Sequence, residues 1–577
     1  MCKYIEYMKR MGISELRNYL GQDIIDLLVQ WLPNGDNLLT KNKMISLINS
    51  IYGKKIFKEK TFRQDLLQCV EPQEIQKIKD LFLDKSDCKN KSLSEIIDII
   101  VNKPWKKSDL NNYIVNLLEV PFDPFEETHD EEVVESVINA PSEQFYELLD
   151  YQYYIKQRVL NVLNSGFPLE RMLVHMPTGT GKTKTTMHII TNYINFSLKN
   201  EGAVIWIAHT NELLNQAYDT FLNVWQHLGN GPINVYKLCG NKNIENIEQP
   251  LNGIVFCGLQ KLMSVSKTNE KLYTRLKKDC RLVVFDEAHK AGAQETKTII
   301  NELIKMPQGY KNRALIGLTA TPGRTTDTSI ENKLLTDMFG RKLISIDSDI
   351  INKINYGPLQ ALNKIAEKNI IKYFQERKIL SKMSTERLTY QQNFTEKELN
   401  VLRSALNDLG YDEKEYTKEQ LEVLASNKER NIAIIKRIKE LSIDKIPVIV
   451  FACSLNHARI LSAMLTIENI PNSLVLGDMD KTERKKAIKM FKDKNTNVNV
   501  IINYEVLTTG FDSKNIKCVF ITRPTKSIVL YSQMLGRGLR GPLMGGNEEC
   551  LLIDIDDNID AYDNETAFSH FNGYWNI

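Results

Sequence analysis

Met176-Pro-Thr-Gly-Thr-Gly-Lys-Thr183 joins an apolar run to an amphipathic segment, and this stretch guides the interpretation of the whole chain. The preceding run, Met172–Met176, is predicted to be a buried strand, and the segment that follows is predicted to be a helix. Glycines let backbone N–H groups surround phosphate oxygens, and the N-terminus of the following helix adds partial positive charge. Lys182 can reach the β- and γ-phosphates of a nucleotide, and the Thr183 hydroxyl can ligate Mg²⁺. The stretch therefore predicts a phosphate-binding loop.

A second motif, Val283-Val-Phe-Asp-Glu-Ala-His289, is an apolar run that ends in two acids. Parallel sheets place ligand groups at the carboxyl ends of their strands. Asp286 is suited to hold Mg²⁺ through water, because hard cations take oxygen ligands. Glu287 is suited to polarise an attacking water, and His289 could couple the nucleotide site to a second domain. Together with the phosphate loop, these residues predict a site for nucleotide hydrolysis.

Short apolar runs alternate with amphipathic segments in two regions of the chain. The runs lack strict alternation, which is typical of strands buried on both faces of a parallel sheet. We therefore expect two doubly wound α/β domains. The predicted strands are Met172–Met176, Ala203–Ala208, Gly253–Cys257, Leu282–Phe285 and Ala314–Leu318, followed by Val448–Phe451, Ser473–Leu476, Val498–Asn503, Cys518–Thr522 and Cys550–Asp554.

Residues 1–118 are predicted to form short amphipathic helices, among them Ile13–Trp31 and Ile75–Leu83. Basic residues gather at 54–63 in this region. They either form an edge that docks DNA or a partner, or they form a solvated face, and the sequence leaves both alternatives open.

The remaining segments are predicted from charge and proline content. Residues 119–150 hold 11 acidic side chains and no Lys or Arg, and the prolines among them indicate a linker. One hypothesis is that this acidic segment occupies a basic groove when nucleic acid is absent. Residues between the two α/β domains are charged and lack a strand pattern, so they predict a helical arm. The predicted domains and segments are 1–118 (helical domain), 119–144 (acidic linker), 145–348 (first α/β domain), 349–428 (helical connector or arm) and 429–577 (second α/β domain).

Composition excludes several classes of protein. The chain has 577 residues, 42% hydrophobic and 25% charged, as expected of a globular protein of several domains. No apolar stretch reaches the ~18–20 residues that span a bilayer, and the first ten residues hold no apolar signal core, so we expect no membrane association and a cytoplasmic location. The nine cysteines are dispersed without a C-x-x-C pair, which predicts reduced thiols and no structural zinc.

The two motifs, together with others in order along the chain, resemble those of superfamily 2 helicases and translocases. The phosphate loop and Asp286–His289 resemble motifs I and II. The others are Leu149–Gln152 (Q motif), Ala208–Gln216 (Ia), Gly258–Leu262 (Ib), Thr319–Pro322 (III), Ile449–Ser454 (IV), Leu507–Asp512 (V) and Gln533–Arg540 (VI). The resemblance implies tandem RecA-like domains that use ATP and Mg²⁺ and bind nucleic acid, most simply DNA.

The resemblance also implies a role for individual residues. Arg537 and Arg540 lie three apart, so both can face one cleft, and their guanidinium groups suit phosphate contact. The implied catalytic residues are Lys182, Glu287, Gln533, Arg537 and Arg540. The implied nucleotide-binding residues are Gln152, Thr178, Gly179, Thr180, Gly181, Lys182, Thr183, Gly510 and Asp512, with Thr183 and Asp286 at the metal. The residues implied in nucleic-acid contact or coupling are Thr210, His289, Thr319, Thr321 and Thr508.

Three variations narrow the resemblance. Motif II reads D-E-A-H, motif VI lacks an initial histidine, and motif III reads Thr319-Ala-Thr321. These features are similar to bacterial DNA-repair translocases and to motor subunits of restriction or anti-phage defence systems. Gly258 stands where motif Ib usually has a hydroxyl, and no nuclease signature is seen, so a nuclease would be a partner subunit. The alternatives are an RNA helicase and a nucleotide-gated scaffold for a partner nuclease.

Overall fold

The computed structural model describes residues 3–31, 39–84, 88, 91–120, 124–125, 135–138, 146–198, 201–240, 243–244, 248–292, 294–305, 312–321, 330–346, 370–407, 415–508, 511, 514–525 and 527–556. The chain divides into two compact units. Unit 1 comprises Met1–Asp130, Leu388–Asn407 and Thr417–Val506, and unit 2 comprises Glu131–Arg387, Asp408–Tyr416 and Leu507–Ile577. The predicted N-terminal helical domain is thus grouped with a portion of the second α/β domain.

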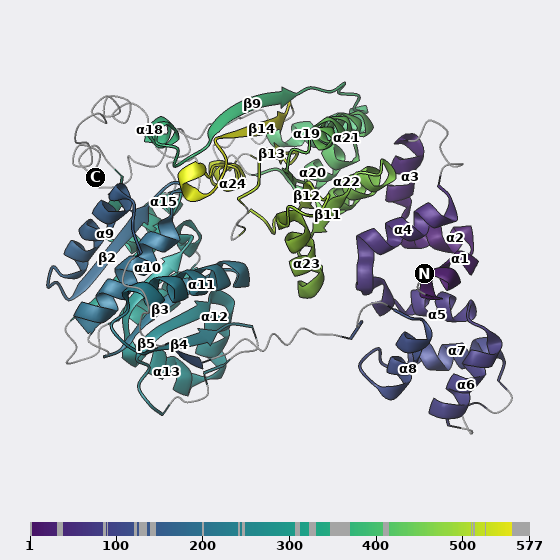
Figure 1. The fold of residues 1–577 in the computed structure, drawn as a ribbon, viewed down its shortest axis with the longest axis horizontal. Helices are drawn as coiled ribbons and strands as arrows, with labels where there is room; N and C mark the ends of the chain where they lie inside the picture. The colour runs from purple at the N-terminus through teal and green to yellow at the C-terminus, as the bar shows by residue number, and fades with distance from the viewer. Residues whose placement is uncertain are drawn as a thin grey trace. The chain divides into compact units, whose positions relative to one another are not determined.

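Unit 2 is built on an eight-stranded sheet of order β1-β4-β5-β3-β6-β7-β2-β8 (Figure 1). All neighbours pair in parallel except β1, which runs antiparallel to β4. The strands are β1 (Glu135–Ile138), β2 (Leu169–His175), β3 (Ala203–Ala208), β4 (Ile233–Leu238), β5 (Gly253–Gly258), β6 (Cys280–Asp286), β7 (Arg313–Thr319) and β8 (Leu343–Ser345). The parallel order confirms the predicted α/β architecture of this region.

Helices cover both faces of this sheet, as a parallel sheet requires. Alternate residues of β3 serve two cores: Val204 and Trp206 pack with one group of helices, and Ile205 and Ile207 with the other. The first group is α9 (Asp150–Leu163), α10 (Lys182–Tyr193), α11 (Asn211–Leu228) and α18 (Ile370–Glu376). The second is α12 (Leu259–Thr268), α13 (Glu270–Asp279), α14 (Gln294–Ile304) and α15 (Ile330–Met338).

The strands of the second predicted α/β domain form a further sheet. Its strands in unit 1 have the order β11-β12-β10, and those in unit 2 have the order β13-β14-β9. The strands are β9 (Lys382–Leu388), β10 (Val448–Phe451), β11 (Asn472–Val475), β12 (Val500–Asn503), β13 (Cys518–Ile521) and β14 (Glu549–Ile555). Strand β12 pairs in parallel with both β10 and β11, and β13 pairs in parallel with β14. Together with the sheet of unit 2, these strands confirm the predicted tandem RecA-like fold.

Helices make up the rest of unit 1. The N-terminal helices are α1 (Lys3–Arg10), α2 (Ile13–Leu20), α3 (Gln22–Trp31), α4 (Lys41–Tyr52), α5 (Lys60–Gln68), α6 (Pro72–Phe82), α7 (Leu93–Asn102) and α8 (Asp109–Leu117), with a 3₁₀ turn, η2, over Gly53–Lys58. The later helices are α19 (Glu396–Asn407), α20 (Lys418–Ser426), α21 (Lys428–Ile443), α22 (Leu455–Ile467) and α23 (Lys481–Lys492), while α24 (Ile528–Leu535) belongs to unit 2. The predicted helical N-terminal region is confirmed.

The prediction missed four strands and the break between two helices. Strands β4 and β8 were not among the predicted runs. The segment predicted as a linker contributes strand β1, and the segment predicted as a purely helical arm contributes β9. Both strands lack an apolar run, and the side chains of β9 are exposed or half-buried, so hydrophobic periodicity did not indicate them. The helix predicted over Ile13–Trp31 is two helices, because Gly21 takes a φ of +86° that ends α2.

Within the described ranges, no helix is both long enough and apolar enough to span a bilayer. The cysteines of those ranges are free thiols. No group of three or more His, Cys, Asp or Glu side chains suited to hold a metal was found among the described residues.

Candidate active site

The phosphate loop lies between β2 and α10, as the sequence predicted. Gly179 and Gly181 take φ values of +87° and +82°, a region that side chains with a Cβ rarely adopt. A Cβ on Gly181 would lie 2.3 Å from Nε2 of Gln152, so no larger residue fits. The Thr180 hydroxyl folds inward and donates to the Pro177 carbonyl at 2.7 Å. These contacts favour the curved backbone of the loop.

The Q-motif residues hold this loop in place through hydrogen bonds. The Tyr151 hydroxyl and the Gln152 amide both donate to the Thr180 carbonyl, at 2.6 and 2.9 Å. The amide oxygen of Gln152 accepts the Leu149 N–H at 3.0 Å, and the side chain is almost fully buried. Gln152 thus holds the loop in place, while its implied contact with adenine stays a prediction.

Tyr151 was missed by the sequence analysis, since an aromatic residue beside a helix start usually indicates only core. Arg377 was missed as well: it binds Asp150, at the start of α9, through two bonds of 3.0 and 2.8 Å. These partners lie 227 residues apart, so no local pattern could have linked them.

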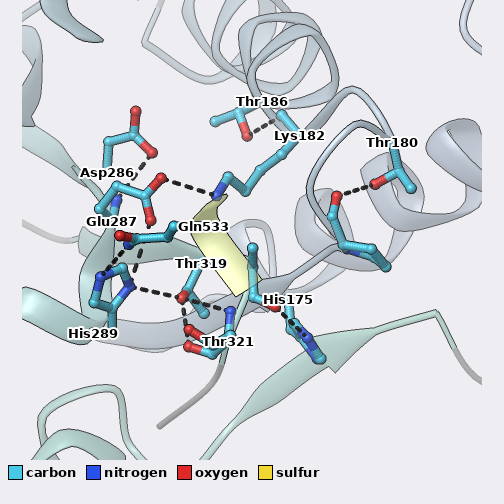
Figure 2. Close-up of polar contacts among 12 residues, drawn as sticks. His175, Thr180, Lys182, Thr186, Asp286, Glu287, His289, Thr319, Thr321 and Gln533 are labelled. Atoms are coloured by element: carbon cyan, nitrogen blue, oxygen red, sulfur yellow. Dashed lines mark hydrogen bonds and ion pairs between the residues drawn. The ribbon is translucent and has the colours of Figure 1, made fainter. Parts of the chain in front are cut away.

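The two acids lie where β6 ends. Glu287 takes a φ of +52°, uncommon for a residue with a side chain, and its N–H donates to Oδ1 of Asp286 at 3.0 Å. This turn aims the Glu287 carboxylate at Lys182, whose Nζ lies 3.8 Å from Oε1 (Figure 2). The sequence placed these three residues in one site, and the structure brings them together.

The surroundings of Asp286 and Glu287 shift the pKa values of the two carboxyl groups in opposite directions. Burial, together with the neighbouring charge of Glu287, raises the pKa of Asp286 to about 6, although Lys182 opposes the rise. Burial also works against ionisation of Glu287, but the charges of Lys182 and Lys290 outweigh it and lower the pKa of that carboxyl. Glu287 is therefore held as the ionised base, and Asp286 is a buried carboxyl that a cation would stabilise.

A chain of polar contacts leads from Glu287 to motif VI (Figure 2). Nδ1 of His289 lies 3.2 Å from the Thr319 hydroxyl and 3.4 Å from Oε2 of Glu287. Nε2 of His289 lies 3.0 Å from the Gln533 amide nitrogen. The Thr319 hydroxyl donates to the Thr321 carbonyl at 2.5 Å and accepts the Thr321 N–H at 3.0 Å. We call His289, Thr319, Thr321 and Gln533 the coupling network.

The hydrogen bond from Gln533 determines which ring nitrogen of His289 carries the proton. Because the Gln533 amide donates to Nε2, the ring proton must lie on Nδ1, where it can donate to Thr319 or Glu287. Burial lowers the pKa of His289 to about 3, so the ring is neutral at physiological pH. The residues of the coupling network are therefore linked by hydrogen bonds, and not by a charge on the imidazole.

The arginines of motif VI lie in the same unit. Nη1 of Arg537 donates to the Phe511 carbonyl at 2.5 Å, and its Nε donates to the Gln533 carbonyl at 3.2 Å. Burial lowers the pKa of Arg537 to about 10, with Glu287 acting in the opposite direction. Burial also lowers the pKa of Arg540 to about 10. Both stay charged, and a buried cation next to a phosphate loop suits a polyanionic ligand.

Motif VI also packs closely against the phosphate loop. A Cβ on Gly536 would lie 2.3 Å from Cγ2 of Thr178, and one on Gly179 would lie 3.6 Å from Cγ of Arg540. The Arg540 carbonyl accepts the Ser381 hydroxyl at 2.6 Å. Gly536 thus lies against Thr178, and Arg540 lies beside Gly179.

These residues fit ATP and Mg²⁺. The curved Gly179–Gly181 backbone leaves room that a Cβ would fill, and Lys182 opens α10 with its amine near the acids. Thr183 and Asp286 offer the oxygen atoms that Mg²⁺ prefers, and Asp286 is a carboxyl group whose pKa burial raises although Lys182 lies nearby. Thr183 is half-buried at the first turn of the helix.

The other predicted residues have different positions. Thr210 caps α11 by accepting the Leu213 N–H at 3.3 Å, so its hydroxyl hydrogen can still donate to a phosphate. Thr508 is buried. Gly258 ends β5 and is the N-cap residue that precedes α12, with its backbone in the extended region. Gly510 and Asp512 lie outside the described residues, and their predicted contact with the nucleotide stays a prediction.

The basic cluster near the N-terminus is used inside unit 1. Lys54 pairs with Asp480 at 2.9 Å, and Lys55 with Asp478 at 2.8 Å. Arg63 is buried and donates to the Phe57 and Lys58 carbonyls. These three side chains thus contribute to contacts within unit 1, and a DNA-docking or partner-docking role of the basic cluster stays a prediction.

Comparisons with known proteins agree with this geometry. The family model described as "Type III restriction enzyme, res subunit" matches residues 145–324, and the one described as "Helicase conserved C-terminal domain" matches 429–541. A Saccharomyces cerevisiae protein named as the ATP-dependent helicase IRC3 is 25% identical over 416 residues, 71% of this chain and 51% of that protein. A Schizosaccharomyces pombe protein named as a mitochondrial ATP-dependent helicase is 25% identical over 71% of this chain and 58% of its own length.

The type I restriction enzyme EcoAI endonuclease subunit of Escherichia coli is 24% identical over 68% of this chain and 44% of that subunit. This chain thus spans about half the length of these relatives. Fold, site and comparisons together define the class: the chain has the tandem motor domains of a superfamily 2 helicase or translocase. Within that class it resembles the motor subunits of restriction enzymes.

Proposed function

We propose that this chain is a nucleic-acid-dependent ATPase that moves along DNA and converts ATP and water to ADP and phosphate. The observation that carries the proposal is the continuous set of contacts from Lys182 through Glu287 and His289 to Gln533. It joins the phosphate loop to motif VI, so a change at the nucleotide has a physical route to the second motor domain.

Each side chain has a stated task in this proposal. Glu287, held ionised, accepts a proton from the attacking water. Lys182 and Arg537 place positive charge where negative charge develops on the transferring phosphoryl group. Asp286 and Thr183 would hold Mg²⁺, which when bound supplies charge neutralisation between the β- and γ-phosphates. The neutral ring of His289 keeps the Glu287 carboxylate and the Gln533 amide in fixed orientation.

DNA is the proposed track, and a restriction or anti-phage defence system the proposed setting. Support comes from the restriction-subunit family model and the EcoAI relative. A motor that moves over any sequence must contact backbone phosphates rather than bases, which suits the hydroxyl hydrogen of Thr210 and backbone amides. A partner nuclease or another complex subunit would supply the cleavage that a restriction system needs.

The experiment that tests the proposal is the rate of ATP hydrolysis with and without DNA for wild type, Glu287→Gln and Glu295→Gln. Replacing Glu287 removes the base and should lower the stimulated rate by roughly 10²–10⁴-fold. Glu295 is an exposed acid of the same unit that pairs with Lys267 at 3.6 Å, so it is the matched control and should keep the wild-type rate. A Glu287→Gln protein with wild-type turnover would overturn the catalytic assignment.

The same assay separates the alternatives. Single-stranded DNA, duplex DNA and RNA are compared at fixed salt, because phosphate-driven affinity falls steeply as salt rises. Stimulation by RNA alone would replace the DNA proposal with an RNA helicase. Binding of ATP without stimulated turnover, together with an unaffected complex with a nuclease, would favour a nucleotide-gated scaffold.

A further inference from the structure

The five residues that follow helix α18, residues 377–381, lie outside every helicase motif. In the structure they contact three parts of the candidate active site, all within unit 2: the start of α9, the phosphate loop and the end of motif VI. We call these five residues the clasp. A short segment that contacts three parts of one site is suited to hold them at fixed positions.

The first residue of the clasp is joined to the Q motif. Arg377 donates to both carboxylate oxygens of Asp150, and such a paired arrangement fixes geometry as well as charge. The Arg377 side chain is only 13% exposed. Asp150 begins α9, and the next residue, Tyr151, donates to the Thr180 carbonyl of the phosphate loop. Arg377 can therefore act on the phosphate loop through the start of α9.

The chain turns sharply in the middle of the clasp. Lys378 takes a φ of +57°, in the left-handed region that residues with a Cβ rarely adopt. Its carbonyl accepts the N–H of Leu543, just beyond motif VI, at 3.0 Å. After the turn, Leu380 lies against the phosphate loop, since a Cβ on Gly179 would lie 3.2 Å from Cδ2 of Leu380. An unfavourable backbone conformation at such a junction is typical of a functional constraint.

The end of the clasp pairs with motif VI as one strand pairs with another. Leu380 and Arg540 are partners in an isolated antiparallel bridge. On one side of this bridge, the Gly541 N–H donates to the Ile379 carbonyl at 2.9 Å. The backbone of Arg540, one of the implied catalytic residues, is thus held by the clasp.

Ser381 adds a side-chain contact to this pairing. It is fully buried, and its N–H donates to the Leu539 carbonyl at 2.9 Å. Its hydroxyl lies 2.6 Å from the Arg540 carbonyl and 2.7 Å from the Asn547 carbonyl, so one hydrogen is shared between two acceptors. Removal of this hydroxyl would leave both buried carbonyl groups with one donor fewer.

We propose that the clasp is a positioning element of the nucleotide site. Ser381 positions Arg540 for the γ-phosphate of ATP, and Arg377 positions the phosphate loop through the start of α9. The inference rests on the proposed function, because it assumes that ATP is hydrolysed at this site. It predicts different effects at the two ends of the clasp. ADP carries no γ-phosphate, whereas the phosphate loop holds phosphates that ATP and ADP share.

The test measures DNA-stimulated ATP hydrolysis and the binding of a fluorescent ADP analogue by the full chain. The test variants are Ser381→Ala and Arg377→Gln. Ser462→Ala is the control for the first, because it removes a similarly buried hydroxyl that donates to Asn472 at 2.7 Å in unit 1. Arg341→Gln is the control for the second, because it breaks an exposed pair with an aspartate of unit 2 at 2.7 Å. Thermal melting checks that each variant folds.

For Ser381→Ala we expect a kcat about tenfold lower, because a small displacement of a catalytic group slows the reaction, and a dissociation constant for ADP within about twofold of wild type. For Arg377→Gln we expect a dissociation constant for ADP about tenfold higher, because the loop loses a support. Both controls should match wild type in kcat and in ADP binding. If Ser381→Ala does not fold, Ser381→Cys, which keeps the shape and weakens the donor, takes its place.

Three results would overturn the inference and leave the proposed function standing. One is a kcat for Ser381→Ala equal to that of Ser462→Ala. Another is an equal loss of kcat and of ADP affinity in Ser381→Ala, which would mean that Ser381 supports the fold of the site as a whole. The third is wild-type ADP affinity in Arg377→Gln. Wild type that does not hydrolyse ATP would overturn the proposed function itself.

Discussion

The coupling network of unit 2 and the charged contacts of unit 1 use polar residues in opposite ways. In unit 2, neutral and charged groups are buried and share hydrogen bonds, as in the row His289, Thr319 and Gln533. In unit 1, Lys55 and Asp478 form an ion pair whose side chains are 44% and 32% exposed. A buried network loses much when one member is removed, whereas an exposed pair loses little. The comparison shows where single substitutions should matter.

The largest effect in the buried region is expected for Arg537→Ala. The variant loses a buried guanidinium group that lies near Glu287 and that we propose to act on the transferring phosphoryl group, so the stimulated rate of hydrolysis should fall by about 10³-fold or more. Arg437→Ala, a partly exposed arginine of α21, is the control and should behave as wild type. A loss of less than threefold in Arg537→Ala would remove that residue from the catalytic set.

A smaller effect is expected for Thr319→Val, which keeps the shape of the side chain and removes its hydroxyl. The Nδ1–H of His289 and the N–H of Thr321 would lose an acceptor, at a cost of about 1–3 kcal/mol. We expect a DNA-stimulated kcat about tenfold lower with little change in KM for ATP, measured by steady-state kinetics. Thr298→Val, at an exposed position of α14, is the control; equal kcat in the two variants would mean that the network does not assist turnover.

The smallest effects are expected in unit 1, and they should differ between neighbours. The Lys54 side chain is only 7% exposed and pairs with Asp480, so Lys54→Ala should cost about 1–3 kcal/mol of stability and lower the thermal midpoint. The exposed Lys55 should contribute about 0–1 kcal/mol, and Lys55→Ala should melt close to wild type. Equal midpoints for the two variants would contradict this distinction between buried and exposed pairs.

Much of the motor fold could be predicted from the sequence, for a physical reason. Strands buried on both faces of a parallel sheet need continuous apolar runs, and β3 and β10 have the residue bounds that the runs of Ala203–Ala208 and Val448–Phe451 indicated. Strands at the margin of a sheet need no such run. For that reason β1 and β9 were missed.

The sequence indicated individual residues of the site, but not the contacts between residues that lie far apart in the chain. The glycine-rich loop and the two acids are local patterns that chemistry explains. The contact between His289 and Gln533 joins residues 244 positions apart, and only the fold brings them together. The same holds for Lys54 and Asp480, whose ion pair joins residues that only the fold brings together.

The measurement that tests the coupling network most directly is the ratio of DNA-stimulated to unstimulated ATP hydrolysis in wild type and in Gln533→Leu. The substitution keeps a side chain of similar size and removes the amide that donates to His289. If the network links the nucleotide to the second motor domain, the ratio in Gln533→Leu should fall by about tenfold or more towards one. A variant with the wild-type ratio would contradict the account.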